Sequence, residues 1–146
     1  MSTAAEPVAT QAQVAPISGL VPMIRVTDVE RSAAFYRLLG FEIGNRVPRV
    51  GPPHWAWLYQ PKAAEWKRGA NLMLVRGEGG FESNPDTHVV LYLYAANLVE
   101  LRQELIAANG KVSEITYPEY LPKGEFQTHD PDGYTVMVAQ SFEDTP

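Results

Sequence analysis

The sequence predicts an α+β fold of two βαβββ modules that form a curled mixed sheet around a central trough. An apolar strand and a helix are expected within residues 20–40, and the same order recurs at 88–110. Each half closes with another apolar strand, at 71–75 and 135–139, so equivalent points lie roughly 64 to 70 residues apart. A glycine-containing stretch at 77–86 reads as the hinge between the halves.

Length and composition fit one domain. The chain has 146 residues, of which 45% are hydrophobic and 20% charged, as in an ordinary globular protein. We expect a single domain at 18–142, with modules at about 18–77 and 86–142. Residues 1–17 and 143–146 are expected to be tails.

Charge and cysteine content exclude several classes of protein. The net charge of −5 argues against a nucleic-acid partner, which requires a basic surface. The absence of cysteine excludes disulfides, thiolate catalysis and zinc–thiolate sites, and it fits a reducing compartment. No stretch approaches the ~20 apolar residues of a membrane span, and residues 1–17 lack a signal-peptide pattern. We therefore expect a cytoplasmic protein with no membrane partner.

The first module shows clear signals at the ends of its elements. Residues 20–26 form an apolar, strand-like run. Residues 27–30, Thr-Asp-Val-Glu, match a helix capping box in which either the Thr or the Asp is the N-cap. Gly40 is a natural helix stop. Strands are then predicted at 54–59 and 70–76.

The second module repeats these signals. Asn97 provides a polar cap with an acid three residues later, and Gly110 stops the helix. The sequence Asp-Pro-Asp-Gly at 130–133 predicts a tight turn. The strands expected in this half are 88–94, 111–117, 126–129 and 134–139.

Two strings of residues resemble the vicinal oxygen chelate superfamily. They are Val-Thr-Asp-Val-Glu-Arg-Ser-Ala-Ala-Phe-Tyr at 26–36, followed by Leu-Gly-Phe at 39–41, and Asp-Pro-Asp-Gly-Tyr at 130–134. The superfamily includes glyoxalase I, extradiol dioxygenases, fosfomycin-resistance enzymes and bleomycin-resistance proteins. The resemblance extends over about residues 19–140.

The resemblance also implies where a metal would bind. In metal-dependent members the ligands lie on the first and last strands of each half, and the matching positions here are Val21, Met73, His88 and Met137. One histidine among these positions cannot hold a hard divalent ion, which prefers several oxygen or imidazole donors. The resemblance therefore favours the metal-free branch, typified by bleomycin-resistance proteins, which are dimers that sequester a ligand in an aromatic-lined groove. It implies a homodimer, no cofactor and no catalytic residues.

The expected ligand is a small molecule, partly aromatic or apolar. Trp55 and Trp57 share one face of a strand and would form an aromatic wall, whereas a dimer interface or packing against a helix is the alternative, and the more frequent, explanation of such a face. Arg25 interrupts an apolar strand and requires an anionic partner, either on the ligand or on an internal glutamate. His88 is either a ligand contact or a core histidine. The expected ligand-binding residues are Arg25, Trp55, Trp57, Met73, His88, Tyr92, Phe126 and Met137.

Two other functions remain open. The chain could be a lyase, isomerase or dioxygenase-type enzyme that uses a shifted metal site of His88, His129 and Glu125, or an acid–base pair of Glu125 and His88. It could also be an accessory domain whose trough is filled with side chains. One fold supports many functions, so residue chemistry must decide among them.

Overall fold

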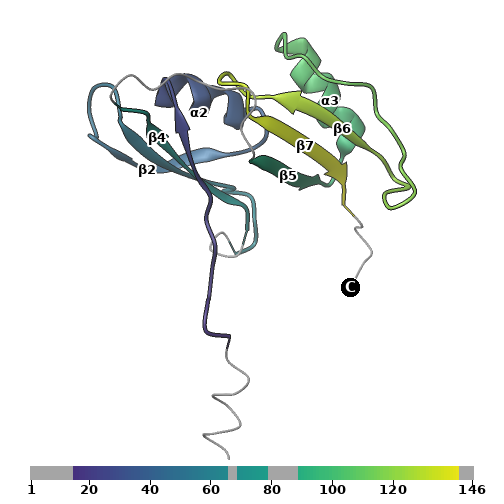
Figure 1. Ribbon diagram of the computed structural model, residues 1–146, viewed down its shortest axis with the longest axis horizontal. Helices are drawn as coiled ribbons and strands as arrows, with labels where there is room; N and C mark the ends of the chain where they lie inside the picture. Colours follow the sequence, from purple (N-terminus) through teal and green to yellow (C-terminus); the bar gives the residue numbers. More distant parts are fainter. Residues whose placement is uncertain (1–14, 66–68, 79–88, 142–146) are drawn as a thin grey trace, which may run out of the picture.

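The computed structural model describes residues 15–65, 69–78 and 89–141 of the chain. Two sheets lie side by side, each with one helix packed on it (Figure 1). No helix in these ranges is long and apolar enough to cross a membrane. In chain order the elements are β1 (Met23–Val26), α2 (Val29–Arg37), β2 (Glu42–Val47), β3 (Trp55–Tyr59), β4 (Asn71–Arg76), β5 (Val90–Ala95), α3 (Leu98–Ala107), β6 (Glu125–His129) and β7 (Thr135–Gln140).

The two sheets share one topology, which confirms the predicted α+β repeat. The first sheet has the strand order β1-β4-β3-β2, with β1 parallel to β4 and the other pairs antiparallel. The second has the order β5-β7-β6, with β5 parallel to β7 and β6 antiparallel to it. Each module therefore places its first strand beside its last, with the helix in the connection between them.

The second module differs from the prediction at residues 111–117. The strand expected there is reduced to two isolated bridges, Val112 to Thr128 and Thr116 to Glu125. Between them the hydroxyl of Ser113 accepts a hydrogen bond from the backbone N–H of Gln127 at 2.8 Å. A side-chain oxygen thus takes the place of a backbone carbonyl, and a regular ladder cannot continue through this point.

Both helices begin at the predicted polar caps. Asp28 is the N-cap of α2, and its carboxylate accepts from the backbone N–H groups of Glu30 and Arg31. Asn97 caps α3 in the same way, accepting from Glu100. After α3 it is Asn109, one residue before the predicted glycine stop, that takes the left-handed conformation with φ of 66°, which asparagine tolerates better than most residues.

The core lies between each sheet and its helix. Along the strands of each sheet, alternate residues point toward the helix of that module, so one face of each sheet is buried. The largest fully buried side chains include Tyr36, Leu58, Leu74, Leu98, Leu105, Phe126 and Val136. Within the described residues no helix covers the opposite faces of the two sheets, which we call the open faces.

The turn before β7 joins the two modules. The carboxylate of Asp132 accepts from the backbone N–H of Thr27 at 3.1 Å and from its hydroxyl. It also receives a longer contact of 3.4 Å from Arg31. The two strings that carried the family resemblance therefore contact each other, although about 100 residues separate them.

Candidate functional site

The open face of the first sheet is aromatic and apolar. Met23 and Met73 are partners in the β1–β4 register, and Met73 also lies opposite Trp57 on β3. Along β1, β3 and β4, strand alternation places eight residues on this face: Met23, Arg25, Trp55, Trp57, Tyr59, Asn71, Met73 and Val75. Four of the predicted site residues, Arg25, Trp55, Trp57 and Met73, are thus brought together on one surface, and these side chains are partly or largely exposed.

Trp57 is held in a fixed orientation on this face. Its indole N–H donates a 2.7 Å hydrogen bond to the side-chain oxygen of Asn71. Its ring stacks on Tyr59, with ring centroids 5.1 Å apart and planes inclined by 13°. Gly44, at a β-bulge of β2, leaves room for the ring, because a Cβ atom there would overlap Cζ3 of Trp57. The indole is therefore already positioned before any ligand arrives.

Arg25 lies on the same face and is exposed. Among the described residues no acid forms an ion pair with its guanidinium. Its backbone carbonyl accepts a 2.7 Å hydrogen bond from the hydroxyl of Tyr134. The internal glutamate partner considered from the sequence is thus absent from the described part of the chain, and the charge faces outward.

The open face of the second sheet is built around a buried acid. Glu125 is only 6% exposed, and its two carboxylate oxygens accept from the hydroxyls of Tyr92 at 2.6 Å and Tyr120 at 3.1 Å. These hydrogen bonds, with a smaller contribution from burial, raise the pKa of both tyrosines. Both hydroxyls therefore remain proton donors throughout the neutral range. Met137 lies beside Tyr92 on β7.

Two expected ligand-binding residues require separate comment. The structure corrects the expectation that Phe126 binds the ligand. Its side chain is 1% exposed and packs in the core between the second sheet and α3. It pairs with Val138 on β7, whereas the open face carries Met137, so strand alternation turns its ring away from Tyr92. His88 lies outside the described residues.

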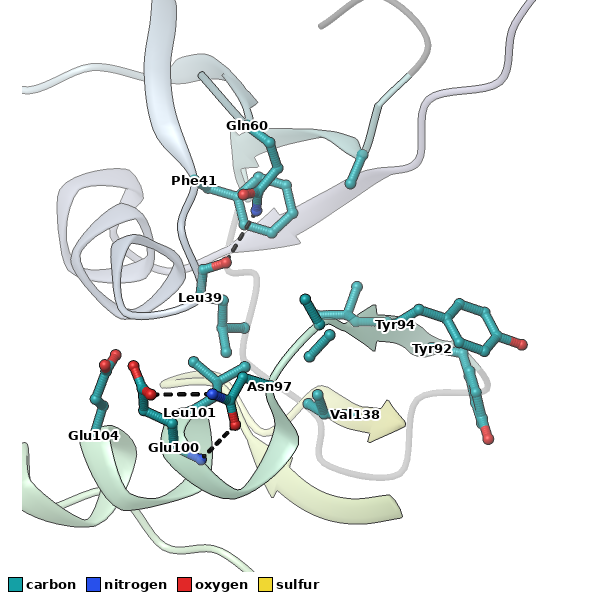
Figure 2. A pocket seen from close by; sticks show the side chains of 14 residues that line it. Leu39, Phe41, Gln60, Tyr92, Tyr94, Asn97, Glu100, Leu101, Glu104 and Val138 are labelled. Carbon is teal, nitrogen blue, oxygen red and sulfur yellow. Dashed lines mark hydrogen bonds between the residues drawn. The ribbon is translucent and has the colours of Figure 1, made fainter. Parts of the chain in front are cut away.

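A cavity of about 590 Å³ lies between the two modules. Figure 2 shows Leu39, Phe41 and Gln60 of the first module on one side and the start of α3 on the other, with Glu100 and Glu104 at its rim. Of the predicted site residues, it includes Tyr92 alone. Sequence reasoning missed this cavity because its wall combines a loop after α2 with the β5–α3 turn, and no local pattern connects those segments.

The metal-ligand positions implied by the resemblance do not fit a hard divalent ion. Val21 precedes β1, and Met73 and Met137 offer only thioether sulfur, a soft donor. Within residues 15–65, 69–78 and 89–141 no three His, Asp or Glu side chains lie close enough together to hold a metal.

The paired modules and uncovered sheet faces define a class of proteins built by repeating a βαβββ unit. The chain belongs to the Glyoxalase/Bleomycin resistance protein/Dioxygenase superfamily, whose family model matches residues 16–138.

Solved structures share this fold at low sequence identity. A bleomycin resistance determinant encoded on the transposon Tn5 is 18% identical, with a TM-score of 0.65 over 86% of this chain and 99% of that chain. A bleomycin-binding protein in complex with bleomycin is 19% identical, with a TM-score of 0.64 over the same shares. TnmS3, an antibiotic binding protein from Streptomyces sp. CB03234, is 21% identical, with a TM-score of 0.62 over 87% and 98%. Among curated proteins no sequence matches the chain.

Proposed function

We propose that this protein is a metal-independent small-molecule binding protein that sequesters a partly aromatic ligand. The main support is the preset orientation of Trp57, which is held by Asn71 and Tyr59 on a sheet face that neither α2 nor α3 covers. Aromatic rings with little freedom to lose on binding suit recognition of a planar ligand. Arg25, exposed on the same face, would bind an anionic group of that ligand.

The similar structures agree with this proposal. Two of them are described as bleomycin-binding or antibiotic-binding proteins, and both present the same fold. The thioethers of Met23 and Met73 add adaptable apolar surface to the aromatic wall. The absence of hard donors at Val21, Met73 and Met137 supports binding without a metal ion.

A homodimer is part of this proposal. Met23 is 57% exposed and Leu20 89%, and exposed apolar surface of this kind is typical of interaction surfaces. A second copy placed against an open face would enclose a ligand between two sheets. Sedimentation equilibrium should give twice the mass of 16.2 kDa, and a purely monomeric protein would contradict this part. The cytoplasmic location expected from the cysteine-free sequence stays a prediction.

The enzymatic alternative has less support. Glu125, its proposed acid or base, is engaged by Tyr92 and Tyr120. Its proposed partner His88 lies outside the described residues.

A titration with 1-anilinonaphthalene-8-sulfonate, a planar aromatic anion, tests the proposed binding face. We expect saturable binding that is weakened at least about fivefold in Trp57→Ala and in Arg25→Gln, because each removes a contact of roughly 1 kcal/mol or more. Arg49→Gln, which removes an exposed charge from a loop, is the matched control. Circular dichroism verifies that all variants are folded. Equal affinities for all four proteins would rule out this face as the binding site.

A further inference from the structure

Glu125 is a buried carboxylate for which neither the core nor the proposed aromatic wall has a use. It lies at the start of β6 on the open face of the second sheet and is 6% exposed. Within the described part of the chain, no Lys, Arg or His forms an ion pair with it. Its hydrogen-bond partners there are the phenols of Tyr92 and Tyr120.

These two phenols satisfy the carboxylate incompletely. A carboxylate has about four acceptor positions, and the tyrosines occupy one on each oxygen. Burial of an acid is costly unless a positive charge or a full set of donors compensates it. The arrangement leaves acceptor capacity for a further donor, and a cationic donor would compensate the burial best.

The surroundings of Glu125 also favour a cation. Tyr92, which pairs with Met137 of the central strand β7, reaches diagonally across that strand to Glu125, which pairs with Ala139. Tyr94 lies next to Tyr92, with ring centroids 5.5 Å apart and planes inclined by 56°. Aromatic faces attract cations electrostatically, an effect strongest where water is displaced. The third ring, Tyr120, is 71% exposed and lies in the loop before β6, so its hydroxyl can yield its place to a ligand.

We propose that this face binds an organic cation, a protonated amine or similar ammonium group, among Tyr92, Tyr94 and Tyr120, with Glu125 supplying the opposite charge. The inference rests on the proposed function and deepens it by naming a cationic group on the ligand. The two open faces then have complementary preferences, since Arg25 on the first sheet favours anions and Glu125 on the second favours cations.

Methionine methyl NMR tests this site directly. Met137 lies beside Tyr92 in the strand register, and Met73 belongs to the first sheet, so ¹³C-methyl labels distinguish the two faces. The probes are 2-phenylethylamine, which is cationic at pH 7, and the neutral 2-phenylethanol. We expect the amine to shift the Met137 signal and to bind more tightly than the alcohol. Glu125→Gln should weaken amine binding about tenfold or more, whereas Glu119→Gln, an exposed acid in the adjacent loop, should not.

Tyr120→Phe keeps the proposal testable if Glu125→Gln fails to fold. Loss of this exposed hydroxyl frees one carboxylate oxygen and retains the ring, so amine affinity should rise roughly two- to fivefold; unchanged or weaker binding would overturn the cation site.

Equal affinities for amine and alcohol, or full amine binding by Glu125→Gln, would also overturn it. If the sulfonate binds the first sheet but the amine shifts no Met137 signal, the cation site is wrong while the proposed function stands. If neither probe binds, both are wrong.

Discussion

The hydroxyl of Tyr36 donates a 2.8 Å hydrogen bond to Oδ2 of Asp130, across 94 residues of sequence. Tyr36 belongs to α2 of the first module and Asp130 to the turn between β6 and β7 of the second. The other oxygen of Asp130 accepts from the backbone N–H groups of Asp132 and Tyr134. One buried carboxylate therefore shapes the turn and fastens it to the helix of the other module.

The bond predicts a clear loss of stability in Tyr36→Phe. The variant keeps the buried ring but leaves Asp130 without a donor on one oxygen, which should lower the free energy of unfolding by about 1–3 kcal/mol. Urea denaturation measures the change. Tyr94→Phe, which removes an exposed hydroxyl, is the control and should remain within about 0.5 kcal/mol of the wild type. Equal losses in the two variants would mean that the Tyr36 bond contributes nothing specific.

Asp130 also predicts a pH dependence of stability. Burial raises its pKa above the usual value near 3.9, outweighing the hydrogen bonds from Tyr36 and the backbone, which lower it. The folded state holds the proton more tightly than the unfolded state, so the associated stability is fully present below about pH 3.9 and is lost as the pH rises through the folded-state pKa.

Asp130→Asn isolates this contribution, because an amide does not titrate and its oxygen can still accept from the turn. As the pH rises from about 4 to 7, the wild type should lose stability that the variant keeps. The free energy of unfolding of the variant minus that of the wild type should therefore increase. Urea unfolding of both proteins across this range measures the difference. A difference that stays constant with pH would show that Asp130 has the same pKa in both states.

Local sequence patterns predicted much of the fold and part of the arrangement of the candidate residues on the strands. Capping residues marked the starts of both helices, and two-residue alternation placed Arg25 with Met73 on one face and Trp55 with Trp57 on one face of their strand. These features depend on neighbouring residues along the chain. The module repeat was predicted from strand, cap and glycine signals that recur in the two halves, and the contact of Asp132 with Thr27 explains why the two strings of the family resemblance occur together.

The remainder depends on strand register, which no local pattern specifies. The β6–β7 pairing sets Phe126 opposite Val138 and thus in the core, whereas its aromatic character alone suggested a binding role. The same register brings Glu125 within reach of Tyr92, 33 residues away. Hydrophobicity gives no sign of such a bridge.

Gly44 predicts a test of the aromatic wall. A Cβ atom at this position would overlap the Trp57 ring, so Gly44→Ala should displace the indole from its stack on Tyr59. We expect a changed near-ultraviolet circular dichroism spectrum and at least about a threefold loss of sulfonate binding, because the wall is no longer preset. Gly19→Ala, where an added Cβ meets no atom within 4 Å, should change neither. An unaltered spectrum in Gly44→Ala would show that the ring does not depend on the glycine.

Phe126 and Trp57 should respond in opposite ways to truncation, since one lies in the core and the other on an open face. Phe126→Leu leaves unfilled space beside α3 and should lower the free energy of unfolding by about 1–2 kcal/mol, with sulfonate and amine binding unchanged below the melting temperature. Trp57→Ala should reduce sulfonate binding with a smaller loss of stability, because its ring is only partly buried. Thermal unfolding combined with the two titrations separates these effects. Loss of ligand binding in a fully folded Phe126→Leu protein would return this residue to the binding site and contradict the register of β6 against β7.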